Sequence, residues 1–229
     1  MARHSALRRG FKFRYTRQLD LGEKSMPVDM NLTEAIYNCR AMRRIKPEPV
    51  PESLLLELID AARQAPSGSN TQNSRWIVVR DDKLKQGLAE LNRRHAEPYI
   101  APQRENPGND KRKRLLDAVV WQMDHMHEIP ALIVACFEYP EKVAGLEVYR
   151  QAGSVWPGIQ NLLLTARALG LGAAPTTLAL RDQEAVRELL HLPETFAALC
   201  LIPVGYPMGN FGPVSRRPLE QIMRFDRWS

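Results

Sequence analysis

Residues 63–76 read RQAPSGSNTQNSRW, and this stretch decides how we interpret the fold. It lies between an amphipathic helical run and the apolar residues 77–79, and its small polar side chains can turn tightly and offer hydrogen bonds. A connection from a helix to a strand usually needs only about two to six residues. The greater length of this one, with Pro66 and Gly68 inside it, indicates a loop shaped to hold a ligand. A plain surface loop is the alternative interpretation.

The composition is that of a globular protein. The chain has 229 residues, of which 44% are hydrophobic and 25% are charged, and no apolar run approaches the length of a membrane span. We therefore expect one domain, no membrane association and a cytoplasmic location. The three cysteines lie far apart and form no CxxC pair. This spacing favours reduced core thiols over disulfides, and it predicts no metal site.

The positive charge is concentrated near the N-terminus. The formal net charge is +6, and no acidic residue precedes Asp20 in a head that contains five arginines. We interpret residues 1–30 as a flexible basic arm, with a mitochondrial-type presequence as the alternative. Aromatic residues are not interleaved with the basic clusters as a base-stacking platform requires. Nucleic acid is therefore not expected as a partner.

Periodicity and capping residues predict an ordered series of helices and strands. Asn31 and Asp81 are candidate N-caps, Ser154 is a third, and Gly170 is a candidate helix end. The continuous apolar run 131–137 predicts a central strand buried on both faces. The predicted helices are 32–40, 52–65, 82–91, 155–169 and 182–190, and the predicted strands are 77–79, 131–137 and 199–204.

Two segments are predicted to lack regular structure. Residues 95–110 contain three prolines and a glycine, which predicts an irregular excursion within a candidate lid at 95–114. The last residues, 211–229, contain Phe211, Phe225 and Trp228, which need a surface to cover them. We expect this extension to reach across to a partner subunit.

Short motifs narrow the chemistry. The patterns GxGxxG, GxxxxGK[ST] and GxSxG are all absent, which removes the main support for dinucleotide-binding, P-loop and serine-hydrolase functions. Residues 40–44 hold three arginines. Guanidinium groups match phosphate oxygens, so this segment is a candidate anion clamp, with a solvated charged surface as the alternative. The small residues 172–177 would let a ligand approach the backbone closely.

In combination these motifs resemble the FMN-dependent nitroreductase family over most of residues 31–223. The resemblance rests on an arginine segment at 40–44, Pro49-Val50-Pro51, the loop Ala65-Pro66-Ser67-Gly68 with Asn70, Gln72 and Trp76, Gly170-Leu171-Gly172, and Gly205-Tyr206-Pro207. Residues 216–223 are similar to the iodotyrosine deiodinase branch. Each motif is weak alone, but four in register are specific.

The resemblance implies an α+β fold with a central mixed or antiparallel sheet flanked by helices. It also implies an intertwined homodimer with FMN at the interface and residues 31–210 as the FMN-binding domain. Arg40, Arg43 and Arg216 would hold the FMN phosphate, with backbone contacts from Ala41 and Met42 and a weaker contribution from Arg44. The flavin would lie against Ser67, Gly68 and Asn70, and its ring edge would lie near Pro175, Thr176 and Thr177.

The activity implied by the resemblance is ping-pong electron transfer from NADH or NADPH through FMN to a small acceptor. Nitroaromatics and quinones are the expected acceptors, and no catalytic side chain is expected because the cofactor carries the chemistry. Reductive dehalogenation, or flavin cleavage to a vitamin B12 base, is the alternative within this fold. The lid has Glu97 and Tyr99 but lacks the spacing of the deiodinase clamp. A non-catalytic flavin-binding or nucleic-acid-binding protein is the alternative of another class.

Overall fold

The computed structural model describes residues 30–142 and 152–228, and the predicted basic arm lies outside this range except for Met30. Its centre is a four-stranded sheet of order β1-β2-β4-β3 in which each neighbouring pair is antiparallel. The strands are β1 (Ser74–Val79), β2 (Ala131–Glu138), β3 (Gly172–Ala173) and β4 (Phe196–Gly205). The antiparallel pairing confirms the predicted α+β class, and β1 begins three residues earlier than predicted.

Helices surround this sheet in the described part of the chain. The α-helices are α1 (Leu32–Asn38), α2 (Glu52–Arg63), α3 (Asp82–Glu105), α4 (Asp110–His125), α6 (Val155–Ala168) and α7 (Gln183–Leu190). Two of the predicted N-caps are confirmed by hydrogen bonds. Asn31 Oδ1 accepts from the Glu34 N–H at 2.8 Å, and Asp81 Oδ1 accepts from Lys83 and Leu84, each at 3.0 Å. Ser154 occupies the N-cap position of α6 but makes no side-chain cap.

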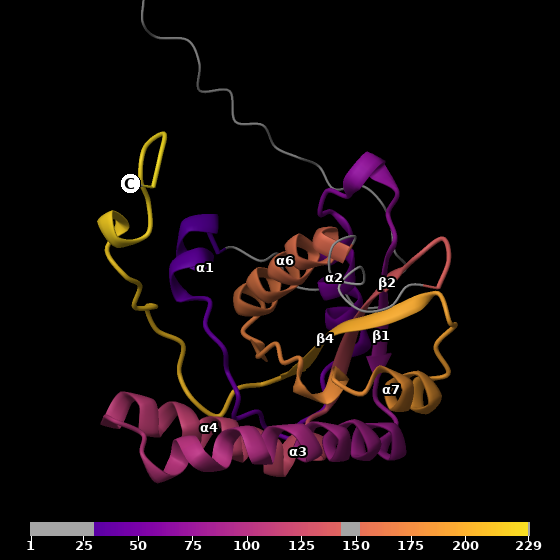
Figure 1. Cartoon of the computed structure of the whole chain (residues 1–229), viewed down its shortest axis with the longest axis horizontal. Helices are drawn as coiled ribbons and strands as arrows, with labels where there is room; N and C mark the ends of the chain where they lie inside the picture. Colours follow the sequence, from indigo (N-terminus) through magenta and orange to yellow (C-terminus); the bar gives the residue numbers. More distant parts are fainter. Residues whose placement is uncertain (1–29, 143–151, 229) are drawn as a thin grey trace, which may run out of the picture.

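Strand β2 is buried on both faces, as its continuous apolar sequence predicts. Ala131, Ile133, Ala135 and Phe137 enter one core cluster, while Leu132, Val134 and Cys136 enter the other. This alternation follows from the two-residue period of a strand. Helices α2 and α6 pack residues into the first cluster, and α3 and α7 pack residues into the second, so the sheet lies between two helical layers (Figure 1).

The expected irregular excursion at 95–110 is wrong. Helix α3 runs without a break to Glu105 and includes Pro98 and Pro102, so only residues 106–109 connect it to α4. Each proline removes one helical N–H donor. The helix persists because Ala96 and Ile100 are buried against Leu116 and Met123 of α4. Tertiary packing therefore overrides the local proline signal. The candidate lid at 95–114 consists of the end of α3, a short connection and the start of α4.

The chain after β4 leaves the core and runs beside α1. The Val214 N–H donates to the Tyr37 carbonyl at 3.0 Å, and the following segment rises along α1 in Figure 1. Large apolar side chains in both parts are exposed in this protomer, namely Leu32, Ile36, Tyr37, Leu219, Ile222, Met223, Phe225 and Trp228. Phe225 and Trp228 are thus uncovered in this protomer, as predicted, whereas Phe211 packs against the second core cluster.

The cysteines behave as core or partly buried thiols. Cys136 and Cys200 are buried, and burial raises the pKa of each thiol to about 12. All three cysteines are free. No helix in the described ranges combines the length and apolarity needed to cross a bilayer.

Candidate functional site

The arginine segment 40–44 is fixed at the end of the sheet by backbone hydrogen bonds on two sides. The Met42 N–H donates to the Ala173 carbonyl at 3.0 Å, and the Met208 N–H donates to the Arg44 carbonyl at 2.9 Å. The next residue after Arg44, Ile45, forms an antiparallel bridge with Pro207 and is buried. The arginines are therefore carried on extended backbone anchored by the side chains of Met42 and Ile45.

This segment concentrates cations that lack acidic partners. Arg40, Arg43 and Arg44 form no ion pair within residues 30–142 and 152–228, and the N–H groups of Ala41, Arg43 and Arg44 find no acceptor there. Arg43 is half-buried, and this burial lowers the pKa of its guanidinium. A guanidinium stays charged at neutral pH even so. Unpaired guanidinium groups beside free backbone donors fit a phosphate group.

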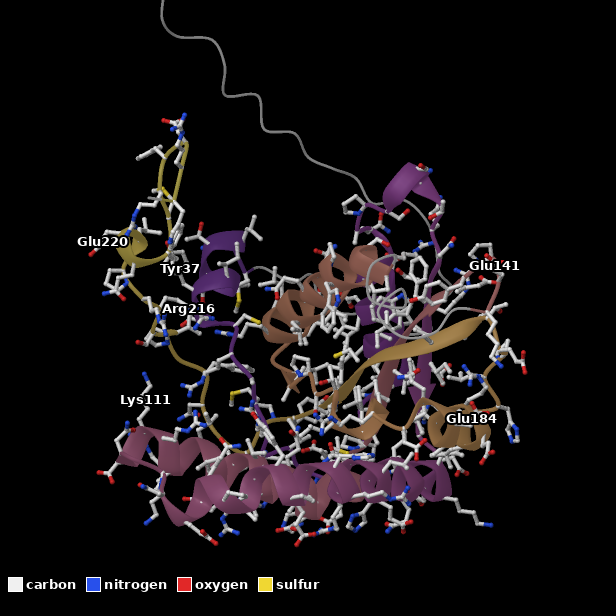
Figure 2. All side chains as sticks on the ribbon, viewed as in Figure 1. Tyr37, Lys111, Glu141, Glu184, Arg216 and Glu220 are labelled. Atoms are coloured by element: carbon white, nitrogen blue, oxygen red, sulfur yellow. The ribbon has the colours of Figure 1, made fainter. Side chains whose placement is uncertain are left out.

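Arg216 belongs to the same region of the protomer. The pKa of the half-buried Cys39 thiol, which precedes Arg40, is raised by burial and is lowered in part by the charges of Arg167 and Arg216. Arg216 therefore lies within electrostatic reach of Cys39, the residue that precedes the arginine segment. Figure 2 shows Arg216 on the same side as Tyr37. Among the described residues, the Arg216 guanidinium donates only to the Ser215 carbonyl, at 3.1 Å.

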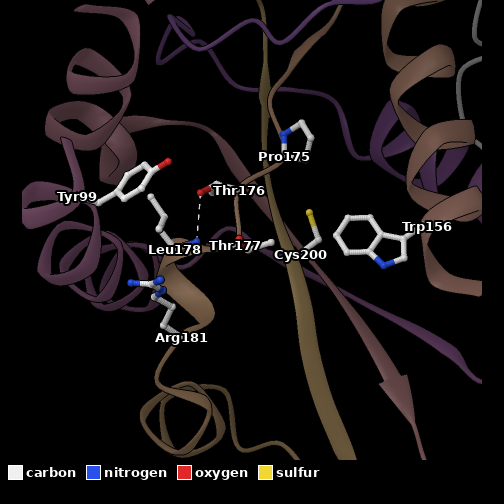
Figure 3. A pocket seen from close by; sticks show the side chains of 8 residues that line it. All are labelled: Tyr99, Trp156, Pro175, Thr176, Thr177, Leu178, Arg181 and Cys200. Atoms are coloured by element: carbon white, nitrogen blue, oxygen red, sulfur yellow. Dashed lines mark hydrogen bonds between the residues drawn. The ribbon is translucent and has the colours of Figure 1, made fainter. Parts of the chain in front are cut away.

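Residues 175–177 line a pocket beside β4. The pocket has a volume of about 510 Å³ and opens between α3 and the start of α6 (Figure 3). Its lining residues are Tyr99, Trp156, Pro175, Thr176, Thr177, Leu178, Arg181 and Cys200. Pro175, Thr176 and Thr177 were predicted from the sequence, whereas Trp156, Leu178, Arg181 and Cys200 were not. Tyr99 had been placed only in the candidate lid.

The hydrogen bonds around Thr176 limit which groups can face a ligand. Thr176 exchanges two backbone hydrogen bonds with Leu201, at 2.8 and 2.9 Å, so its N–H is already used. Its hydroxyl oxygen accepts weakly from the Leu178 N–H at 3.4 Å and keeps its own hydrogen. The Thr177 N–H has no acceptor among the described residues. The available donors are therefore the two threonine hydroxyls and the Thr177 N–H.

The polar loop within residues 63–76 is strained and lies away from the arginine segment. Ser69, Asn70 and Gln72 have positive φ values of 51, 54 and 54°, a conformation that costs non-glycine residues energy and concentrates at functional sites. The Ser67 hydroxyl stabilises it by accepting from the Gln72 N–H at 3.0 Å. The short turn η1 (Gly68–Asn70) projects at the upper right of Figure 1, on the opposite side of the protomer from Arg216.

The structure thus divides the predicted site residues into two sets. The first set comprises residues 40–44, Arg216 and residues 175–177. Its arginine segment is joined to the pocket through β3, because the Met42 N–H donates to the Ala173 carbonyl. The second set, Ser67, Gly68 and Asn70, is not brought to it within one protomer. An antiparallel sheet between helical layers, with unpaired arginines beside a partly aromatic pocket, defines an α+β protein suited to a phosphate-bearing planar cofactor.

Comparison with known proteins identifies the family. The model described as the nitroreductase family matches residues 36–206. The chain is 32% identical to an NADH dehydrogenase of Thermus thermophilus, in an alignment that covers 88% of this chain and 98% of that protein. The chain therefore belongs to the nitroreductase family and is a flavin-dependent oxidoreductase, as the resemblance predicted.

Two further relatives bear on the activity. A 4-nitrobenzoate reductase of Pseudomonas putida is 30% identical, with 81% of this chain and 90% of that protein aligned. The structure of an oxidized iodotyrosine deiodinase bound to FMN and 3-iodo-L-tyrosine superposes with a TM-score of 0.67 at 28% identity, covering 86% of this chain and all of that one. The fold is thus shared by nitro-reducing and dehalogenating relatives.

Proposed function

We propose that this protein is an FMN-dependent NAD(P)H oxidoreductase that reduces a nitroaromatic, a quinone or a related small acceptor in ping-pong order. The observation that carries the proposal is the continuity of the unpaired arginine segment with the pocket at Thr176. A cofactor with a phosphate at one end and a planar ring at the other would extend from the arginines to the threonines. The proposed cytoplasmic location stays a prediction.

Each residue of the first set has a role in this proposal. Arg43, Arg40 and Arg216 hold the phosphate, and the free N–H groups of the segment add neutral donors. The Thr176 and Thr177 donors face the ring edge and stabilise negative charge there. When bound, FMN would supply the two-electron chemistry. The eight described residues that line the pocket include no carboxylate or imidazole, so binding and orientation are the contributions proposed for them.

The first test is the visible spectrum of the purified protein, followed by anaerobic addition of NADH or NADPH. We expect flavin absorption bands that bleach on addition of the reductant and return when 1,4-benzoquinone or nitrobenzene is added. Comparing the two nucleotides establishes which one is preferred. A colourless protein that does not take up added FMN would contradict the proposal, and so would bound flavin that neither nucleotide reduces.

We further propose a homodimer in which the second subunit supplies Ser67, Gly68 and Asn70 to the FMN site. The separation of these residues from Arg216 in one protomer supports this arrangement. The exposed apolar residues of α1 and of the C-terminal segment support it too, because a partner subunit would cover them. Figure 1 shows these two segments together at the left of the molecule.

Mixed dimers test this arrangement. Arg43→Gln and the double variant Ser67→Ala with Asn70→Ala carry different affinity tags and are co-expressed, and two-tag purification isolates the mixed species. Light scattering should give a mass of twice the 26.1 kDa of one chain. If the two sets meet across subunits, a mixed dimer has one intact site and binds one FMN. If they act within one subunit, both sites are damaged and FMN is lost, which would refute the proposal, as would a monomeric protein.

Reductive dehalogenation is the second candidate, favoured by the presence of Tyr99 in the pocket and by the likeness to the deiodinase structure. Of the lid residues Glu97 and Tyr99, only Tyr99 lines the pocket in this protomer, so an ammonium group of an amino acid finds no carboxylate there. Iodide release from 3-iodotyrosine by the reduced protein distinguishes this activity from nitro reduction.

A further inference from the structure

The pocket beside Thr176 has an uneven charge, because the eight described residues that line it include one cation and no anion. We propose that Arg181 and Tyr99 form an anion subsite that selects acceptors bearing a carboxylate. This inference rests on the proposed function, because it names the substrate class of the same pocket. Arg181 belongs to none of the sequence motifs, and Tyr99 was predicted only as a residue of the candidate lid.

Arg181 is held at the pocket by a buried turn. It directly follows η4 (Leu178–Leu180), in which Ala179 and Leu180 are buried. The Leu180 N–H donates to the Thr177 carbonyl at 3.1 Å, so the turn is tied to the residues proposed to face the flavin. The position of Arg181 is therefore set by the core, while its side chain stays exposed.

The guanidinium of Arg181 forms no ion pair within the described ranges. The adjacent acid, Asp182, is engaged elsewhere. Its side chain caps α7 by accepting from the Ala185 N–H at 3.1 Å, and it lies 3.6 Å from the guanidinium of Arg94. Arg181 thus remains an unneutralised cation at the wall of a pocket, where its fork of donors matches a carboxylate.

Two aromatic residues complete the subsite from other elements. Tyr99 reaches the pocket from α3 with 58% of its surface exposed, and its hydroxyl has no partner among the described residues. Trp156, at the start of α6, is 42% exposed. Figure 3 shows Tyr99 and Arg181 on one side of the pocket and Trp156 on the other. Apolar ring faces with one cation and one hydroxyl suit a planar aromatic acid.

The charge balance also decides between an acid and an amino acid. A zwitterion needs a carboxylate or another acceptor for its ammonium group, and the eight lining residues of this protomer include no Asp or Glu. Burying an ammonium group without a partner is costly. The subsite therefore favours a simple aromatic carboxylate over a zwitterionic amino acid.

Binding of benzoate and of its neutral isostere benzamide, measured by calorimetry on the oxidised protein with its bound flavin, tests the subsite without turnover. We expect the wild type to prefer benzoate, and Arg181→Gln to weaken benzoate binding about 10-fold or more while leaving benzamide binding unchanged. Tyr99→Phe should weaken benzoate binding by a smaller factor. Arg104→Gln serves as the matched control, because Arg104 is an exposed arginine of α3 outside the pocket lining.

Several outcomes would overturn the subsite. One is that the wild type binds benzoate and benzamide equally, and another is that Arg181→Gln binds benzoate as tightly as the wild type does. A third such outcome is an equal loss of affinity for benzoate and for benzamide in Arg181→Gln. A slower reduction by NADPH but not by NADH in Arg181→Gln, with benzoate binding intact, would assign the residue to the nucleotide phosphate instead. Failure of the proposed function appears separately, as missing flavin or absent bleaching in the wild type, and the comparison of benzoate with benzamide can still be made on that protein.

Discussion

Arg43→Gln should weaken FMN binding about 10- to 100-fold, because each charge-assisted hydrogen bond contributes about 1.5–3 kcal/mol. Arg43 is the half-buried arginine of its segment. Burial partly removes its guanidinium from water and so lowers the pKa of that group. A phosphate would restore the interactions that water no longer provides. The dissociation constant is measured by titrating the apoprotein with FMN and following flavin fluorescence.

Two variants give this experiment its controls. Arg43→Lys keeps the charge but loses the planar fork, so its affinity should lie between those of the wild type and Arg43→Gln. Arg80→Gln removes an arginine that is already paired with Glu52 at 2.9 Å and should leave FMN binding unchanged. The phosphate role is wrong if Arg43→Gln binds FMN as tightly as the wild type while remaining folded.

Gly172→Ala should both destabilise the fold and weaken FMN binding. A Cβ at residue 172 would lie 2.8 Å from Ile45 Cδ1, 2.9 Å from Met42 Cβ and 3.1 Å from Pro207 Cβ. Overpacking of this kind costs about 1–3 kcal/mol, and each kcal/mol lowers Tm by about 2–4 °C in a protein of this size. Because Met42 and Ile45 flank Arg43, relief of the overlap moves the arginine segment away from β3.

Thermal unfolding and FMN titration measured on the same variant separate these two effects. Gly212→Ala is the matched control, because a Cβ there has no atom within 4 Å and should change neither quantity. A lower Tm with unchanged FMN affinity would show that the arginines keep their positions independently of β3. An unchanged Tm would show that the neighbouring side chains absorb the extra methyl group.

Much of the fold was predictable because its signals are local. The caps at Asn31 and Asp81 act on N–H groups within three residues, and the run at 131–137 needed only its continuous apolarity to predict a buried strand. The arginine segment and the small residues 172–177 stood out by their residue types, and the family resemblance gave them their expected roles toward FMN. The proline-containing part of α3 was missed because its support comes from α4, which is invisible to a local pattern.

The sequence by itself therefore determined most of the elements and, through the family resemblance, the class of fold and the residues expected at the cofactor. Hydrogen bonds of caps and the periods of helices and strands act over a few neighbouring residues, so the order of residue types is enough to reveal them. Only the tertiary structure decided which of those residues share a site. It separated Ser67, Gly68 and Asn70 from the arginines and brought Tyr99, Trp156 and Arg181 to one pocket. Those positions depend on how α3, α6 and η4 pack on the sheet, and packing between distant segments leaves no local signature in the chain.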